Sequence, residues 1–106
     1  MGNNSMPGRL GTTLFIMLLA GCATQYSPQA QKVREAHESE VKDCERIGEI
    51  YGHASGFHWS QGEAMQSARN QALERAHERD ATHLVWKHAE DSITPAVRGI
   101  AYRCPQ

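Results

Sequence analysis

The chain has 106 residues, and its 11 Lys and Arg against 12 Asp and Glu give a formal charge of −1 with the six His neutral. This length allows one substantial domain, and the near-zero charge excludes the strongly basic surface typical of nucleic-acid binding. With 40% hydrophobic and 22% charged residues, the composition is that of a folding chain rather than a disordered one.

Residues 1–21 have the pattern of a secretory signal peptide. Arg9 and the α-amino group supply positive charge, and an apolar run follows from Leu14 to Ala20. A helix that spans a bilayer needs about 20 apolar residues, and this run is far shorter. The segment therefore predicts export and not a membrane-spanning anchor.

The signal ends in Leu19-Ala20-Gly21-Cys22, which resembles the lipobox of bacterial lipoproteins. The resemblance implies cleavage before Cys22 and a thioether-linked diacylglycerol on its sulfur, with a third acyl chain on the freed amine. Two or more acyl chains hold a protein stably on a membrane, whereas one does so marginally. Ala23 at the next position implies, by the same resemblance, sorting to the outer membrane. The alternative is an ordinary signal peptide with a cysteine at this position by chance.

Residues 22–31 are predicted to be the lipidated cysteine and a polar tether, and residues 32–106 a small periplasmic domain. A tether from Ala23 to Gln31 extends at most about 35 Å. If Cys22 carries lipid, Cys44 and Cys104 remain as an even pair in an oxidising compartment. A disulfide between them would contribute roughly 4 kcal/mol in the chain-entropy model. The alternative is two free thiols, redox-active or metal-binding, although the chain has no C-x-x-C.

The first part of the domain contains two candidate strands. Lys32–His37 fits either a short edge strand around Val33 or one turn of helix after Pro28. Within Val41–Gly52, Ile47 and Ile50 are three positions apart, which breaks strict alternation. A β-bulge at Gly48 would place both isoleucines on one face.

Ser60-Gln61-Gly62-Glu63 is a capping box and predicts a helix from Gln61 to about Arg79. An alanine at every fourth position gives this helix a narrow face of small side chains that would let it approach a sheet closely. The stripe consists of Ala64, Ala68, Ala72 and Ala76. Arg69, Glu74 and Glu78 lie off the stripe and are predicted in solvent. Asp80 is the predicted C-terminal cap, since Asp tolerates the left-handed conformation better than most residues.

Two strands are predicted after the helix, at His83–His88 and Val97–Arg103. Leu84 and Trp86 share one face of the first strand, with Val85 on the other. In the last strand, Ile100, Tyr102 and Cys104 share a face. The order of elements predicts an α+β fold in which a three- to four-stranded sheet packs on one α-helix, in the order (β)βαββ.

Four segments, taken in order, resemble a known family. They are Val41-x-x-Cys44-x-x-Ile47-Gly48-x-Ile50-x-Gly52, Ala64-x-x-x-Ala68-Arg69-Asn70-x-Ala72, Ala81-Thr82-His83-Leu84-Val85 and Gly99-x-Ala101-Tyr102-Arg103-Cys104. Together with the lipobox they resemble the small outer-membrane lipoproteins of the YjeI-type domain-of-unknown-function family. They are more distantly similar to the stress-sensor lipoprotein of the Rcs phosphorelay.

The resemblance covers nearly the whole chain after the signal. It implies the order strand, strand, helix, strand, strand and a fold closed by one Cys44–Cys104 disulfide, and it implies no reaction. The sequence departs from the pattern in two ways. Asp80 stands where a Gly is expected, and the long Pro-rich tether of the Rcs sensor is missing.

The loop from Gly52 to Trp59 carries the candidate partner contact, Phe57, His58 and Trp59. Loops carry binding residues more often than the elements that they join. Tyr51 and Trp59 are predicted to close the end of the small core, and Phe57 is the favoured exposed contact.

Histidines are the candidate metal ligands, although the interpretation favours exposed, titrating side chains and no metal. The candidates are His53, His58, His83 and His88. His83 and His88 are five apart along a strand and are predicted on opposite faces, so they would not chelate together. A site would need one His from each pair, with Glu90 or Asp91.

No sequence pattern points to catalysis or to a cofactor. The chain has no G-x-S-x-G elbow and no Walker or Rossmann glycine pattern. The sequence therefore predicts a non-enzymatic lipoprotein anchored in the outer membrane of a Gram-negative bacterium and facing the periplasm. It would be an envelope interaction or stress-sensing module with a protein partner and no nucleic acid. The alternatives are a periplasmic metal-binding lipoprotein and a minor structural component of the envelope.

Overall fold

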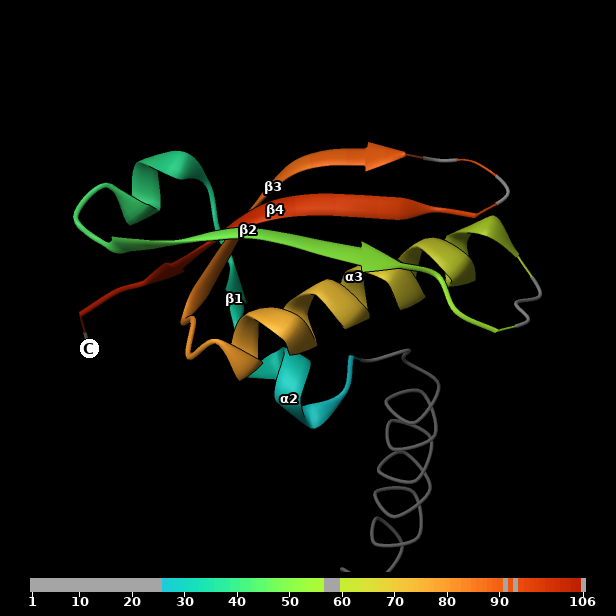
Figure 1. The fold of residues 1–106 in the computed structure, drawn as a ribbon, viewed down its shortest axis with the longest axis horizontal. Helices are drawn as coiled ribbons and strands as arrows, with labels where there is room; N and C mark the ends of the chain where they lie inside the picture. Colours follow the sequence, from blue (N-terminus) through green and yellow to red (C-terminus); the bar gives the residue numbers. More distant parts are fainter. Residues whose placement is uncertain (1–25, 57–59, 91, 93, 106) are drawn as a thin grey trace, which may run out of the picture.

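The computed structural model describes residues 26–56, 60–90, 92 and 94–105. Its elements are α2 (Pro28–Gln31), β1 (Arg34–Glu35), the 3₁₀ turn η2 (Glu38–Val41), β2 (Glu45–His53), α3 (Gln61–Glu78), β3 (His83–Glu90) and β4 (Ala96–Arg103). The strands form one mixed sheet in the order β1-β3-β4-β2, with α3 across one face (Figure 1). The predicted α+β class, with one main helix on a four-stranded sheet, is confirmed.

The start of the domain combines the two alternatives left open for residues 32–37. Pro28–Gln31 forms one helical turn whose N-cap hydroxyl, that of Ser27, accepts a hydrogen bond from the backbone N–H of Ala30. The chain then extends, and β1 pairs in parallel with the first residues of β3. Pro at the first helical position and a serine N-cap both favour a helix start, which explains why a helical turn forms before the chain extends into β1.

Residues 26–31 are part of the folded domain, so the predicted tether over these residues is wrong. Tyr26 packs against the core, and Ala30 is fully buried in it. The Ser27 backbone N–H donates to Asn70 Oδ1 at 2.8 Å, and its hydroxyl donates to Glu74 Oε2 at 2.9 Å. The polar composition of this segment is typical of a tether. Its contacts could not be predicted locally, because its hydrogen-bonding partners lie more than 40 positions away in the sequence.

The bulge predicted in the second strand is present at Gly48. The pairing of β2 with β4 shifts register between Arg46 and Gly48, and Gly48 adopts a φ of 151°. Ile50 is buried and Ile47 packs against the same core cluster. The bulge therefore puts both isoleucines on the face covered by α3, as the sequence predicted.

Helix α3 lies close to the sheet along its alanine stripe. Ser60 Oγ accepts a hydrogen bond from the Glu63 backbone N–H at 3.2 Å and caps the helix. All four stripe alanines and Leu73 are buried. At Gly52, an added Cβ would lie 2.8 Å from the backbone nitrogen of Ala72, so only glycine permits this approach. The main core lies between α3, α2 and this face of the sheet.

The opposite face of the sheet has a smaller apolar patch near one end. Val85 and Ile100 are register partners on this face and are 4% and 5% exposed, although they lie outside the main core cluster. The η2 turn lies on this side of the sheet (Figure 1), and its Val41 is also buried. An ion pair between Lys87 and Glu38 joins η2 to β3. Beyond η2 this face has no covering element among the described residues.

Side chains from α3 occupy the free edge of β2, which is an outer strand. The Arg75 guanidinium donates to the carbonyl of Tyr51 at 2.9 Å, and Arg79 donates to the carbonyls of Glu49 and Ile47 at 3.4 Å. Exposed strand edges are templates for pairing with other chains. The two arginines therefore stabilise the end of α3 and at the same time cover this edge.

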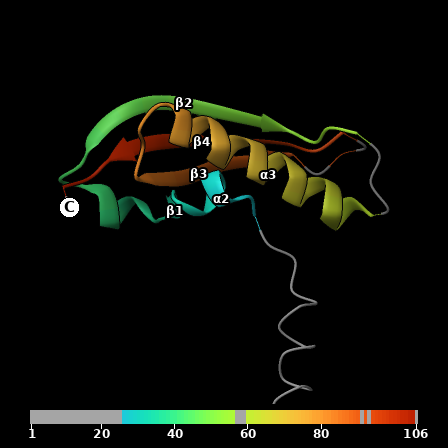
Figure 2. The same ribbon diagram turned by 90° about the horizontal axis from the view of Figure 1, so that it is seen from below.

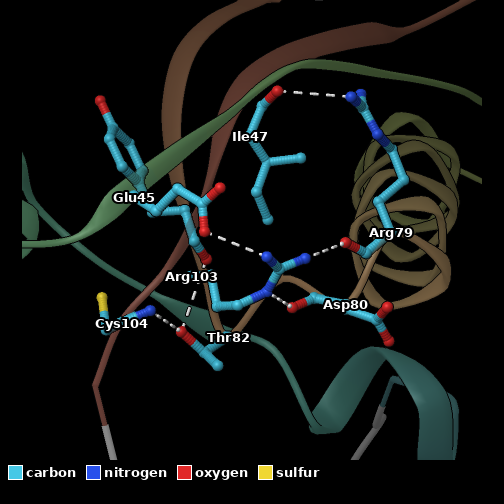
Figure 3. A network of polar contacts seen from close by, with 8 residues as sticks. Glu45, Ile47, Arg79, Asp80, Thr82, Arg103 and Cys104 are labelled. Atoms are coloured by element: carbon cyan, nitrogen blue, oxygen red, sulfur yellow. Dashed lines mark hydrogen bonds and ion pairs between the residues drawn. The ribbon is translucent and has the colours of Figure 1, made fainter.

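The C-terminal end of α3 is tied to β4 by Arg103 (Figure 3). Its guanidinium donates to the carbonyls of Arg79 and Asp80 at 3.2 and 3.1 Å and to the Glu45 carboxylate at 3.1 Å. Asp80 takes the left-handed conformation with a φ of 61°, as its capping position predicted. A cation on the last carbonyls of a helix suits the helix dipole.

Two α3 side chains predicted in solvent instead make tertiary contacts. Glu74 accepts the Ser27 hydroxyl hydrogen bond and a hydrogen bond from Asn70 Nδ2. Arg69 lies over the Trp86 ring, 6.0 Å from its centroid. The prediction for these residues is wrong because the start of the domain packs on the helix at Glu74 and Trp86 of β3 lies beside Arg69, contacts which the alanine stripe alone did not indicate.

Candidate functional site

Exposed polar and aromatic side chains gather on the part of the sheet that neither α3 nor η2 covers. In β2, Glu49, Tyr51 and His53 alternate with residues that face the helix. The register places Tyr51 beside Arg98 of β4, and Arg98 beside His88 of β3. These five residues, Glu49, Tyr51, His53, His88 and Arg98, are called the open face below.

The centre of the open face is a hydrogen-bonded network. The Tyr51 hydroxyl donates to Glu49 Oε2 at 2.8 Å, and Arg98 donates to Glu49 Oε1 at 2.8 Å. The Tyr51 hydrogen bond and the Arg98 charge lower the pKa of Glu49. The same hydrogen bond, with the Glu49 charge, raises the pKa of Tyr51.

These shifts move both groups away from the range that suits proton transfer. A general acid or base works best when its pKa lies near the operating pH. The pKa values of Glu49 and Tyr51 both move away from neutrality, so the carboxylate stays charged and the phenol stays protonated. The network therefore holds an aromatic ring, an anion and a cation beside one another on an exposed surface.

Tyr51 was predicted to close the core, and this prediction is wrong. Its side chain is 47% exposed. The register explains why: once the bulge at Gly48 places Ile50 toward α3, its neighbour Tyr51 must point to the other face. The remaining aromatic contact candidates, Phe57, His58 and Trp59, lie outside the described residues. They come after β2 and residues 54–56 in the chain.

The predicted metal ligands that the structure describes do not form a cluster. Within residues 26–56, 60–90, 92 and 94–105, no group of three or more His, Cys, Asp or Glu could hold a metal ion. His53 ends β2, and His83 begins β3 with its Nδ1 2.7 Å from the Thr82 hydroxyl. His58 and Asp91 lie outside the described residues.

His83 and His88 share a face of the sheet, which corrects the prediction that they lie on opposite faces. A register shift in β3 falls between Trp86 and His88. His83 pairs with Tyr102 and His88 with Arg98, two residues of β4 with the same orientation. Four β4 positions separate these partners, or about 13 Å, so the two rings still do not meet.

Cys44 and Cys104 form a disulfide that joins the start of β2 to the end of β4. Their Cα atoms are 4.4 Å apart, and 60 positions separate them in the sequence. The alternative of two free thiols is therefore wrong. The Cys104 backbone N–H donates to the Thr82 hydroxyl at 2.8 Å, which fixes the bridge to the start of β3 (Figure 3). Cys22, the predicted lipid acceptor, lies outside the described residues.

A shallow groove of about 570 Å³ runs between the β1–η2 segment and β3. Four of its polar side chains pair with one another, because Trp86 Nε1 donates to Glu35 Oε2 at 3.0 Å and Lys87 pairs with Glu38. The groove offers a ligand few free partners. We therefore regard the open face as the better candidate.

Sequence reasoning missed Glu49 and Arg98 as functional residues. Glu49 stands two positions before Tyr51, and this spacing places both on one face of a strand. The alternation was therefore enough to find their contact once the bulge had been assigned. Arg98 carried no such signal, because its neighbours depend on the pairing of β2 with β4.

No protein-family profile matches this chain, and no curated protein shows significant similarity to it. The described part of the chain contains no helix long and apolar enough to cross a membrane.

Proposed function

We propose that this chain is a non-enzymatic lipoprotein, anchored by lipid on Cys22 in the outer membrane of a Gram-negative bacterium, with its domain in the periplasm. The observation that carries the proposal is the division of its three cysteines. Two form the Cys44–Cys104 disulfide, and the third stands at the end of a lipobox, just before the folded domain begins. A disulfide fits an oxidising compartment, and the resemblance to YjeI-type lipoproteins supports the same location.

The domain works by contact with an envelope partner, as an interaction or stress-sensing module. The open face supports this part of the proposal, since Tyr51 is exposed there, and Glu49 accepts hydrogen bonds from both Tyr51 and Arg98. Aromatic and arginine side chains are the residue types enriched at binding hot spots. The candidate contacts Phe57, His58 and Trp59 follow β2 in the chain.

Metabolic labelling with palmitate tests the anchor. Wild-type protein should incorporate the label, and Cys22→Ser should abolish it and leave an uncleaved precursor, because the sulfur is the acceptor. The matched control is Cys44→Ser, which removes the disulfide and should keep the label. Wild-type labelling of Cys22→Ser would overturn the proposed anchor.

A photo-crosslinking amino acid tests the contact. Placed at Phe57 or Tyr51, it should capture a discrete envelope protein, and placed at Glu78 on the exposed side of α3 it should capture less. Capture from Glu78 alone would overturn the assignment of the surface. Capture from none of these positions would favour a structural envelope component instead, and stoichiometric zinc binding by the purified protein would favour the metal-binding alternative.

A further inference from the structure

The inference concerns how the domain faces the membrane, and it rests on the proposed lipidation of Cys22. Cys22 and Tyr26 are four positions apart. Their Cα atoms are therefore at most about 14 Å apart, even in a fully extended chain. If Cys22 is held at the lipid surface, Tyr26 must lie within that distance of it.

Tyr26 is a fixed point on the domain. Its side chain packs against the core, and burial raises the pKa of its hydroxyl, with Glu35 raising it further and Arg69 opposing. Its carbonyl accepts a hydrogen bond from Gln31 Nε2 at 2.6 Å. The contacts of Ser27 with α3 hold the next residue in place. The short connection to Cys22 therefore acts on the rigid domain and not on a loose terminus.

The surface around this point belongs to the helical side of the domain. α2 lies beside α3 on the same face of the sheet, and the open face lies on the other side (Figures 1 and 2). One helix with its side chains is about 10–12 Å across. The open face is therefore separated from α2 by the helical layer and the sheet, a thickness comparable to the whole connection to Cys22.

The chemistry of α2 fits a lipid headgroup surface. The exposed residues of this turn are Pro28, Gln29 and Gln31, followed by Lys32, so it carries no acidic side chain. The two acidic residues nearby already have partners: Glu35 accepts from Trp86, and Glu74 accepts from Ser27 and Asn70. Approach to an anionic leaflet would therefore leave neither Glu35 nor Glu74 without a partner.

We propose that the surface formed by Pro28, Gln29, Gln31 and Lys32 lies against the lipid headgroups, and that the open face points away from the membrane. The protein is thereby oriented by the shortness of its anchor connection. A partner that binds the open face approaches from the periplasmic side and not from within the bilayer.

The test uses the full lipidated protein, purified from membranes and reconstituted into vesicles of phosphatidylethanolamine with a minority of phosphatidylglycerol. The phosphatidylethanolamine carries a radiolabelled headgroup, which a diacylglycerol anchor lacks, so label on the protein reports crosslinking alone. A benzophenone amino acid replaces either Gln29 or Tyr51. Position 29 should take up several-fold more label than position 51, and equal uptake, or more at position 51, would overturn the orientation.

Lengthening the chain between Cys22 and Tyr26 tests whether the short connection causes the orientation. Inserting 12 Gly and Ser residues after Gln25 should bring uptake at positions 29 and 51 close to equal, because a long flexible linker lets other faces of the domain reach the lipid. An unchanged preference for position 29 would overturn the role of the short connection. Mass spectrometry of each sample separates the two proposals. Missing acyl mass on Cys22 overturns the lipoprotein proposal and this inference with it, whereas intact acyl mass with equal uptake in the protein without the insertion overturns the orientation alone.

Discussion

The two faces of the sheet differ in how much of their sequence the fold requires. On the helical face, glycine and alanine let α3 lie close to the strands, and the stripe residues are almost fully buried. On the open face, Glu49, Tyr51 and Arg98 contact mainly one another and the solvent. The fold therefore depends on small side chains on one face, whereas packing constrains the side chains of the open face much less.

Removing the disulfide should have the largest effect, and it sharpens the comparison because the bridge lies at the end of the sheet that α3 does not cover. Cys44→Ala and Cys104→Ala should each lower the free energy of unfolding by about 4 kcal/mol in the chain-entropy model. The double variant should be no less stable than either single variant, because the two share one bond. Chemical denaturation measures all three, and additive losses would contradict the shared bond.

Adding one methyl group to the helical face should have the next largest effect. Gly52→Ala should lower the free energy of unfolding by about 1–3 kcal/mol through overpacking, since the new Cβ meets the backbone of α3. Ala72→Leu should fall in the same range for the same reason.

Gly62→Ala is the matched control. The Cβ added there would have only Ser60 Oγ nearby, at 4.0 Å, so the change should be neutral or slightly stabilising within the first turn of α3. If Gly52→Ala and Gly62→Ala unfold at the same denaturant concentration, the close approach of α3 to β2 is not real.

Changes on the open face should affect binding rather than stability. Tyr51→Ala should lower the melting temperature of the protein much less than Gly52→Ala does, because surface substitutions away from caps and strained positions have small effects. It should reduce the capture of a partner by a photo-crosslinker at Phe57. A loss of stability as large as that of Gly52→Ala would place Tyr51 in the structural part of the sheet and break the comparison.

The sequence was informative where a local pattern determined the structure. The capping box set the start of α3, the alanine spacing set its buried face, and Gly48 set the bulge that orients Ile47 and Ile50. Each depends on residues within a few positions of one another. The pairing of the two remaining cysteines also followed, since only two were left once Cys22 was assigned to lipid.

The sequence was uninformative where distant segments meet. The tether prediction failed because Ser27 finds Asn70 and Glu74 across the fold, and no local pattern marks such contacts. The placement of His83 and His88 failed because the β3 bulge has no glycine to signal it. Tyr51 is different: alternation from the bulge predicts its exposure, whereas the general preference for burying aromatic residues predicts the opposite, and alternation is right.

The smallest expected effect concerns the charge state of Glu49. Its pKa in the folded protein lies below the ordinary value, with the Tyr51 hydroxyl as the largest cause and Arg98 as a further one. Tyr51→Phe keeps the ring and removes the hydroxyl, so the pKa of Glu49 should rise toward the ordinary value of a glutamate. Carboxyl chemical shifts followed by NMR during a pH titration measure this rise.

The direction of the pH dependence follows from the lowered pKa. A carboxyl group with a lower pKa in the folded state stabilises the fold above its unfolded pKa, and this contribution is lost as the pH falls through the folded value. Wild-type protein should therefore lose this contribution in acid, and Tyr51→Phe should lose less because it has less to lose. Tyr102→Phe, on the same face beside Arg46, is the matched control and should leave the Glu49 titration unchanged. If both variants shift the titration of Glu49 equally, the Tyr51 hydroxyl does not hold the network at the centre of the open face. The surface that we propose for binding is then less ordered than the helical face.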